Sequence, residues 1–374
     1  MGAAPIGAPG WPEFAFWTPS IESVRIVLIA RSSSSTEGGF IARIVPVAAS
    51  GRAAGATRYH RSVAPSTSKP RVLVLGDLVL DVVLSPERPI ESGTDVPGTV
   101  GIRQGGSAAN TARWLARLGI DTQLVCAVGR DGAGRSLVVQ AGNDGVRVRA
   151  ARVAGQRTGR IGVIVAPGGE RSFVADRRAA LALAPDHLRP EWFAHLDLIH
   201  VPGYSLMGEP IATTARTAVR MARSGGAQVS CDLSSIGPLL AQGRRAAREL
   251  IASVEPDILF ATETEAQAFL GRHAADDLLE HAAIVVIKRG ARGARVLARE
   301  PDGSALRFDV ATAHVSTVDT TGAGDAFSAG FLAGWLTSRA AGRTIPDALH
   351  RATVAGHRAA ARQLVVTKQE LPPG

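Results

Sequence analysis

Short hydrophobic runs alternate with amphipathic segments along most of the chain. The run at residues 72–75 ends at Gly76, which is typical of a buried parallel strand. Similar runs lie at residues 123–128, 197–201, 227–231, 257–261 and 284–288. Residues 107–118 instead place hydrophobic side chains at helical spacing and stop at Gly119, which indicates a helix with a glycine after its last turn. The same spacing predicts helices at residues 133–140, 210–223, 239–253, 263–270, 323–337 and 346–362.

This alternation predicts an α/β fold with a mostly parallel central sheet that is flanked by helices on both faces. One region departs from it. Residues 160–165 and 171–175 alternate apolar and polar side chains on either side of a Pro-Gly-Gly turn, which predicts a β-hairpin. With the extended segment 82–102, the hairpin is expected to form a small β-sheet lid over a site at the carboxyl ends of the parallel strands.

Residues 1–70 have a different character, with Pro/Gly clusters, a serine run and an arginine-rich, acid-poor composition that faintly resembles an organelle transit peptide. Their one apolar stretch, residues 24–30, is too short to cross a membrane and has no basic region before it, so no secretory signal is predicted. We expect either a disordered extension or translation begun upstream of the true start, with the boundary at residues 69–70.

Composition narrows the class of protein. The 374 residues are 45% hydrophobic and 20% charged, which permits a substantial core and excludes disorder throughout or a disulfide scaffold. The two cysteines suit a reducing, cytoplasmic location. The net charge is +9, but residues 1–70 carry +4 of it and the remainder is dispersed arginine. Neither nucleic acid nor a membrane is therefore an expected partner, and a tail that binds nucleic acid is a distant alternative.

The segment DTTGAGDAF, residues 319–327, joins an apolar strand to an apolar helix. Its two glycines permit tight turns, so successive backbone N–H groups can point to one place at the helix N-terminus and bind an anion such as phosphate. Asp325 would lie in the first helical turn, where an acidic residue is also favoured for helix stability. The spacing matches neither the dinucleotide-binding motif nor the P-loop.

A second glycine-rich segment, GGSAAN at residues 105–110, precedes the helix at 107–118. Its paired glycines permit close backbone approach, and Asn110 offers both a donor and an acceptor to a polyhydroxy ligand. Asp81 follows the first strand, where its carboxylate could accept two sugar hydroxyls. Each feature also has a structural interpretation, such as a helix cap at Ser107, and is weak evidence alone.

Together, in this order and about two hundred residues apart, GGSAAN and DTTGAGDAF resemble the two signatures of the ribokinase-like (PfkB) family of carbohydrate kinases. The resemblance implies one kinase domain over residues 71–374, with the lid at about residues 82–104 and 158–176. It implies transfer of phosphate from ATP, with Mg²⁺, to a hydroxyl of a small-molecule sugar or sugar acid. A homodimer through the lid is a further expectation.

The resemblance also implies roles for single residues. Asp325 matches the catalytic base, and the anion hole matches Gly322, Ala323 and Gly324. The sugar-contacting positions match Asp81, Gly105, Gly106, Asn110 and Asp325. The nucleotide-binding positions match Lys288, Gly290, Gly293, Gly324 and Thr353. Glu265 matches a member of the Mg²⁺–phosphate network, and a monovalent cation, with K⁺ as the candidate, would be held by Asp319 and Thr321.

Two departures from the family pattern leave alternatives open. Thr262 and Thr353 stand where the family usually has asparagine, and threonine cannot reproduce both amide functions, so weaker handling of nucleotide or metal is expected. A nucleoside kinase of the same fold is the first alternative. A catalytically weak relative that senses a sugar or nucleotide is the second. The low aromatic content, 5%, favours sugars over nucleosides because few rings are available to stack on a base.

Overall fold

The computed structural model describes residues 68–271, 275–300, 302–315 and 319–366. The prediction for residues 1–70 falls almost entirely outside these residues. The chain divides into two units, Met1–Ser50 and Gly51–Gly374, and every described residue belongs to the second unit.

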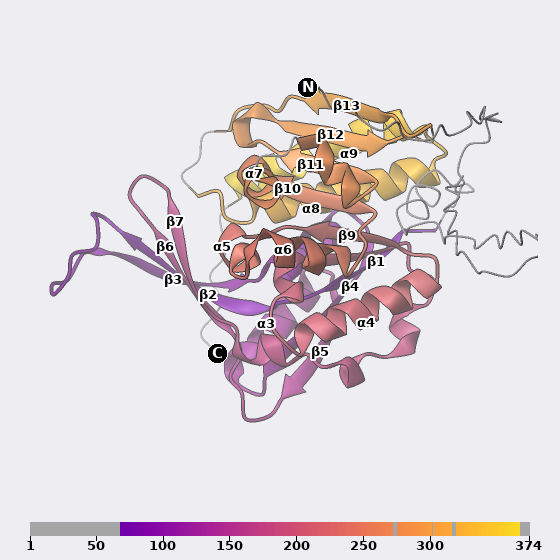
Figure 1. The fold of residues 1–374 in the computed structure, drawn as a ribbon. Helices are drawn as coiled ribbons and strands as arrows, with labels where there is room; N and C mark the ends of the chain where they lie inside the picture. The colour runs from indigo at the N-terminus through magenta and orange to yellow at the C-terminus, as the bar shows by residue number, and fades with distance from the viewer. Residues whose placement is uncertain (1–67, 272–274, 301, 316–318, 367–374) are drawn as a thin grey trace, which may run out of the picture. The chain divides into compact units, whose positions relative to one another are not determined.

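A nine-stranded sheet forms the centre of this unit, in the order β13-β12-β11-β10-β9-β8-β1-β4-β5 (Figure 1). Its strands are β1 (Arg71–Leu75), β4 (Asp121–Gly129), β5 (Arg147–Val153), β8 (Leu198–Pro202), β9 (Gln228–Asp232), β10 (Ile258–Thr262), β11 (Ile284–Lys288), β12 (Ala294–Arg299) and β13 (Ala305–Val310). The strands from β11 to β5 pair in parallel, whereas β12 and β13 add an antiparallel edge. The predicted mostly parallel sheet is therefore confirmed.

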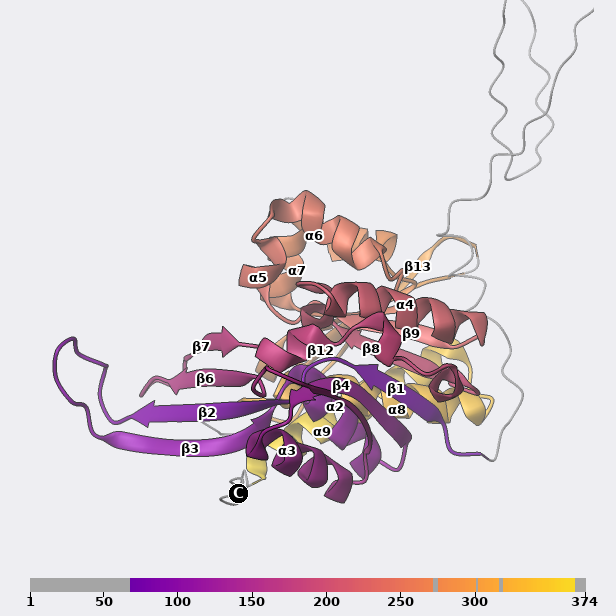
Figure 2. The ribbon, with the colours of Figure 1, turned by 90° about the horizontal axis from the view of Figure 1, so that it is seen from below.

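Helices cover both faces of this sheet (Figures 1 and 2). They are α2 (Ser107–Arg117), α3 (Gly132–Asn143), α4 (Ile211–Ser224), α5 (Ile236–Leu240), α6 (Gly243–Ala252), α7 (Glu263–Leu270), α8 (Ala323–Ala340) and α9 (Ile345–Val365). Successive strand residues point to opposite faces. In β1, Val72 and Val74 join the core under α2, α8 and α9, while Leu73 and Leu75 join the core under α4 and α6. Both faces are buried, which explains the continuous hydrophobic runs.

A separate four-stranded sheet, in the order β3-β2-β6-β7, extends from the main sheet (Figure 2). Its strands are β2 (Val79–Pro86), β3 (Gly98–Gly105), β6 (Arg160–Val165) and β7 (Arg171–Asp176). The structure confirms the hairpin predicted from alternation, and the extended segment 82–102 forms two strands. Among the described residues, no helix combines the length and hydrophobicity that crossing a membrane requires.

Two local predictions differ from the structure. The single helix expected at residues 239–253 is broken into α5 and α6, because Gly243 adopts a left-handed conformation with φ of +86°. The strands β5, β12 and β13 were not predicted. The arginine-rich β5 and the alternating β13 lie at the sheet edges and are only partly buried, so neither carries the continuous hydrophobic run of a central strand.

Candidate functional site

The carboxyl ends of the central strands, the lid and the N-termini of α2 and α8 converge on one site. Asp232 ends β9, Thr262 ends β10 and Lys288 ends β11, so these three side chains come from neighbouring parallel strands at one edge of the sheet. Open α/β sheets bind their ligands at this edge. Two adjoining pockets open there, of about 330 Å³ and about 580 Å³. We call them the acceptor pocket and the nucleotide pocket, after the predicted sugar-contacting and nucleotide-binding residues that line each.

Asp325 lies in the first turn of α8, three residues after the left-handed Gly322 that precedes this helix. Its Oδ1 accepts a hydrogen bond from Ser107 Oγ at 2.7 Å, and its Oδ2 accepts one from Asn110 Nδ2 at 3.0 Å. Both donors come from the first turn of α2. Burial raises the pKa of Asp325 to about 6, against the opposing effect of these hydrogen bonds. A positioned carboxylate whose pKa lies close to neutral pH is suited to take a proton from a substrate.

The acceptor pocket contains most of the predicted sugar-contacting residues. Asp81, Gly106, Asn110 and Asp325 line it, under the lid strands β2, β6 and β7. Gly105 lies beside them and has a different role. A Cβ atom at Gly105 would come within 1.9 Å of Asp81 Oδ1, so glycine is needed there to leave room for the Asp81 carboxylate.

The nucleotide pocket contains four of the five predicted nucleotide-binding residues, namely Lys288, Gly290, Gly293 and Gly324. The structure does not support the fifth. Thr353 is fully buried within α9, and its hydroxyl donates to the Leu349 carbonyl one turn earlier, so it does not line the pocket. A buried threonine on a helix satisfies its hydroxyl through its own backbone, which the sequence pattern could not reveal.

The two pockets meet at Lys288. Its Nζ lies 2.6 Å from Asp232 Oδ2, which also accepts a hydrogen bond from Ser328 Oγ at 3.0 Å. A Cβ atom at Gly324 would lie 3.5 Å from the same ammonium group, which places this charge beside the Gly322–Gly324 turn. Burial opposes the charged form, but Asp232 and Glu265 outweigh it and raise the pKa of Lys288 above its usual value. Lys288 therefore carries a fixed positive charge between the pockets.

Thr262, which stands in place of the usual asparagine, acts as a helix cap. Its backbone N–H donates to Glu265 Oε2 at 2.7 Å, and the Glu265 N–H donates back to Thr262 Oγ1 at 3.2 Å. This reciprocal capping box begins α7. It also fixes the Glu265 carboxylate at the acceptor pocket, where burial and then Asp232 raise its pKa.

Two lid arginines reach the site, and neither was predicted. Arg171 of β7 lines both pockets and donates to Thr321 Oγ1 at 2.8 Å and Thr320 Oγ1 at 2.5 Å. Arg177 follows β7 and donates to both carboxylate oxygens of Asp77, at 2.7 and 2.9 Å. The alternation of the hairpin held a usable signal, because it places Arg171 on the same face of β7 as Phe173 and Ala175, which also line the acceptor pocket. Asp232 was missed as well, although it directly follows a predicted strand.

The predicted monovalent-cation ligands do not fit a cation in their present arrangement. Asp319 Oδ2 accepts from Arg103 Nη1 of the lid strand β3 at 3.2 Å, and Asp319 Oδ1 accepts from the Thr321 N–H at 2.9 Å. The Thr321 hydroxyl is bonded by Arg171. Guanidinium groups thus hold the side chains that would bind the cation. Within the described ranges, no cluster of three or more His, Cys, Asp or Glu side chains could hold a metal ion.

Comparisons with known proteins bear on this site. A family model described as pfkB family carbohydrate kinase matches residues 69–369. The chain is 33% identical over 282 residues to an ATP-dependent ribose-1-phosphate kinase of Halopiger xanaduensis, covering 71% of this chain and 85% of that protein. It is 32% identical over 293 residues to a fructokinase of Klebsiella pneumoniae, covering 75% and 87%. The solved adenosine kinase from Sinorhizobium meliloti aligns with a TM-score of 0.69 and 25% identity, over 79% of this chain and 94% of that chain.

Proposed function

Because this chain belongs to the pfkB family of carbohydrate kinases, we propose that it transfers the γ-phosphoryl group of ATP to a hydroxyl of a sugar or sugar acid held against Asp325. The family match and the aligned structure confirm the family and the ribokinase-like fold that the sequence predicted. The chain is therefore an ATP-dependent carbohydrate kinase. One observation carries the finer proposal: Asp325, whose pKa is raised to about 6, lies in the acceptor pocket beside the turn that separates it from the nucleotide pocket.

The proposed reaction divides the work among the residues already described. Ser107 and Asn110 orient the Asp325 carboxylate, which takes the hydroxyl proton as the substrate oxygen attacks the γ-phosphorus. The Gly322–Gly324 backbone and the Lys288 ammonium stabilise negative charge on the group in transfer. The lid excludes water and thereby suppresses hydrolysis of ATP.

Magnesium would enter this site with ATP. Mg²⁺ in kinases is usually held by one or two carboxylates, waters and the substrate phosphates, and it neutralises phosphate charge. Glu265, which lines the acceptor pocket, provides one such carboxylate. No larger cluster of acidic side chains is needed for this mode of binding, so the described residues fit Mg²⁺.

A nucleoside kinase is the second candidate function, and the lid gives a specific reason to keep it. Phe173 of β7 lines the acceptor pocket and is 55% exposed, so its ring is available to stack on a base. The aligned structure from Sinorhizobium meliloti is an adenosine kinase. A coupled assay of ADP release over hexoses, pentoses, 2-keto-3-deoxy sugar acids and nucleosides separates the two. Turnover of nucleosides alone would replace the proposed acceptor class.

The pH dependence of kcat/KM tests the proposed base. Since Asp325 must be deprotonated to accept a proton and its pKa is about 6, kcat/KM should fall about tenfold for each pH unit below that value. The hydrogen bond from Ser107 lowers this pKa, so the Ser107→Ala variant should begin its decline at a higher pH. A pH–rate profile for each protein measures both effects. Identical profiles that stay flat down to pH 5 would contradict the assignment.

We expect no activation by potassium, because Arg103 and Arg171 already hold the Asp319 and Thr321 side chains. The measurement compares kcat and KM in potassium chloride with those in choline chloride at equal ionic strength. Equal values are expected. A strong increase in kcat that requires K⁺ would show that the cation displaces the guanidinium groups.

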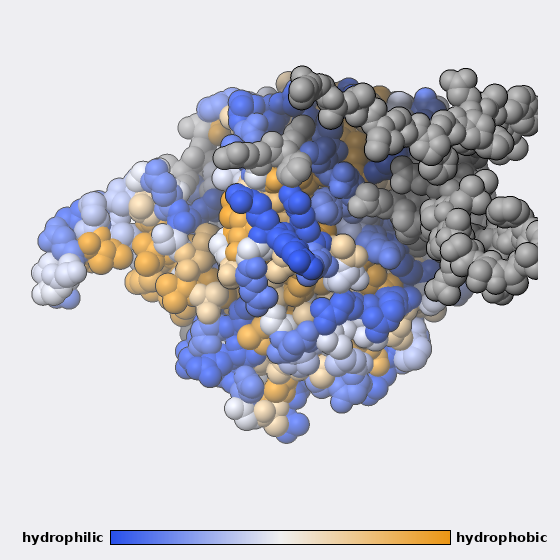
Figure 3. Space-filling view, in the orientation of Figure 1, coloured by the Kyte–Doolittle hydropathy of each residue, from blue (hydrophilic) through white to orange (hydrophobic). Residues whose placement is uncertain are grey.

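We propose that residues 71–374 form the kinase domain and that residues 1–70 are dispensable for activity. We also propose that two copies of the chain pair through their lids. The lid residues Val100, Ile102 and Val174 are 65%, 44% and 67% exposed, and Figure 3 shows hydrophobic residues gathered over the lid. A chain shortened to residues 68–374 should retain kcat and elute as a dimer in light-scattering chromatography. The Val100→Lys variant should elute as a monomer, and a monomeric unmodified protein would contradict the pairing.

A further inference from the structure

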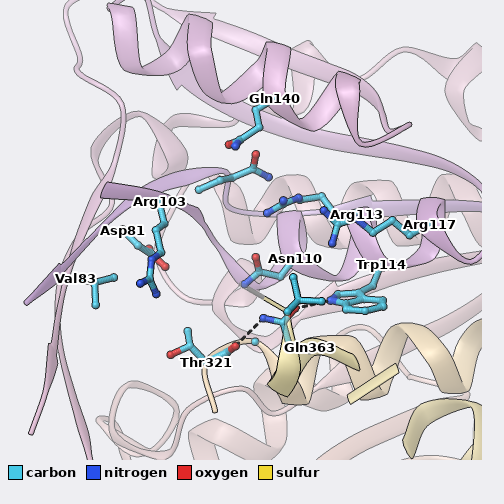
Figure 4. Close-up of a pocket in the computed structure, with 13 residues that line it drawn as sticks. Asp81, Val83, Arg103, Asn110, Arg113, Trp114, Arg117, Gln140, Thr321 and Gln363 are labelled. Atoms are coloured by element: carbon cyan, nitrogen blue, oxygen red, sulfur yellow. Dashed lines mark hydrogen bonds between the residues drawn. The ribbon is translucent and has the colours of Figure 1, made fainter. Parts of the chain in front are cut away.

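The last turn of α9 reaches the Gly322–Gly324 turn through the side chain of Gln363 (Figure 4). Its Nε2 donates to the Thr321 carbonyl at 2.9 Å, across 42 positions of the sequence. Both residues line a third cavity, of about 280 Å³, that lies beside the acceptor pocket. Gln363 belongs to neither glycine-rich motif, and the proposed reaction assigns it no role.

Trp114 of α2 fixes the orientation of the Gln363 amide. Its indole Nε1 donates to Gln363 Oε1 at 2.9 Å, and Trp114 is only 6% exposed. An indole N–H can only donate, so the amide oxygen must face Trp114 and the amide NH2 group must face the Thr321 carbonyl. The two hydrogen bonds therefore require the same orientation of the amide, and they join α2, α9 and the turn.

The bond to Gln363 also sets the direction of the next backbone N–H. The Thr321–Gly322 peptide bond is trans, and in a trans peptide the carbonyl and the following N–H point in opposite directions. Because the Thr321 carbonyl points to Gln363, the Gly322 N–H points away from it. Gly322 lines the acceptor pocket and Gln363 does not, so this N–H is directed to the pocket side of the turn.

Backbone N–H groups at the start of α8 remain available to an anion. Within the described part of the chain, the N–H groups of Gly322, Gly324 and Asp325 donate no hydrogen bond. The Ala323 N–H donates to a backbone carbonyl instead. The first N–H groups of a helix have no partner inside the helix and can therefore bind an anion. The Gln363 amide packs closely against this group, because a Cβ atom at Gly322 would lie 3.2 Å from its Nε2.

We propose that Gln363, oriented by Trp114, is a positioning residue for phosphoryl transfer, because it keeps the Gly322 N–H aimed at the group in transfer. Backbone donors are most effective when they are oriented before charge develops, since no reorganisation is then needed during the reaction. Glycine gives the turn many accessible backbone conformations, and the bond to Gln363 removes that freedom from the peptide before Gly322.

This inference rests on the proposed function, in which the Gly322–Gly324 backbone stabilises negative charge on the phosphoryl group. Gln363 acts only through that backbone and takes no part in the chemistry. Its contribution is therefore expected in the chemical step, which kcat reports, and not in the binding of the acceptor.

The first test replaces Gln363 with methionine, which has nearly the same length but cannot donate to the Thr321 carbonyl. The released peptide should adopt the productive orientation only part of the time. We expect kcat to fall by about 10- to 100-fold, less than the roughly 10²- to 10³-fold that outright loss of one anion-hole donor costs. KM for the acceptor should be nearly unchanged, because Asp81, Asn110 and Asp325 are untouched. Steady-state kinetics of ADP release measure both constants.

Two controls separate this role from a loss of structure. Gln267→Met makes the same change at an exposed position of α7 that lines none of the three pockets described, and its kcat should equal that of the unmodified protein. In Gln363→Met, kcat/KM should decline below the same pH as in the unmodified protein, because Ser107 and Asn110 still hold Asp325. A decline displaced to another pH would show that the variant acts through Asp325 and would overturn the inference.

A double-mutant cycle tests the link to Trp114. Trp114→Phe removes the indole N–H and keeps an aromatic ring in its place, so the Gln363 amide loses its fixed orientation. We expect kcat to fall by about three- to tenfold, the equivalent of one ordinary hydrogen bond. In the double variant, kcat should be no lower than in Gln363→Met alone, because Trp114 acts only through Gln363.

Thermal melting confirms that each variant folds. Full kcat in folded Gln363→Met would overturn the inference and leave the proposed function standing. Losses that add in the double variant would overturn the link between Trp114 and Gln363. No turnover of any sugar by the unmodified protein would contradict the proposed function, and the inference with it.

Discussion

Replacing Asp325 with asparagine is expected to lower kcat by about 10²- to 10⁴-fold, the usual contribution of a positioned general base. The amide is nearly the same size as the carboxylate and remains within reach of Ser107 and Asn110, so the ends of α2 and α8 stay together. It cannot accept the hydroxyl proton, and therefore substrate binding should survive while the chemical step fails. Steady-state kinetics with the best acceptor from the panel measures both quantities.

The matched control is Asp302→Asn, which makes the same chemical change at an exposed turn residue whose carboxylate bonds the nearby Ser304. Its kcat should equal that of the unmodified protein. If folded Asp325→Asn kept its full kcat as well, Asp325 would be a structural helix-terminal acid and the base would have to be sought elsewhere.

Replacing Lys288 with methionine should affect stability and catalysis together. Lys288 and Asp232 are only 12% and 7% exposed, and removing one partner of such a buried pair typically lowers the free energy of unfolding by about 3–5 kcal/mol. The loss also removes the positive charge beside the Gly322–Gly324 turn, so kcat should fall by about 10²- to 10³-fold. Urea denaturation and initial rates measure the two effects separately.

A double variant separates the two roles of this lysine. In Lys288→Met combined with Asp232→Asn, no unpaired carboxylate is left at position 232, so part of the lost stability should return. The charge beside the turn is still absent, and kcat should remain low. Recovery of kcat along with stability would show that Lys288 acts only by balancing Asp232.

The parts of the fold that the sequence predicted are those in which a local pattern and the final environment agree. The strand ending at Lys288 and the helix beginning at Glu263 were predicted with the bounds that the structure has, because a buried central strand and an amphipathic helix need those patterns. Edge strands such as β5 do not need a continuous hydrophobic run, because they are only partly buried. One of their faces meets solvent and tolerates arginine, so their pattern resembles that of a loop.

For the site, short motifs located Asp325 and Asn110, but only the fold could reveal what surrounds them. Asp232 belongs to no motif, and its role follows from the register that brings β9 and β11 to the same edge. Arg171 lies about 150 residues before the threonines that it bonds. Thr353 shows the converse, since a position inferred from a resemblance is buried within α9, where its hydroxyl donates to the Leu349 carbonyl and does not line the nucleotide pocket.

Ser107 and Asp325 are separated by 218 positions in the sequence, yet a single hydrogen bond joins them at the centre of the site. Contacts between such distant segments form late in folding, because closing a long loop costs entropy before any contact compensates it. During synthesis on the ribosome, the amino-terminal half that carries Ser107 and Asn110 emerges well before α8. Nascent or truncated chains that end before α8 therefore lack Asp325 and its hydrogen bond with Ser107, and the site is assembled only when the last quarter of the chain has docked.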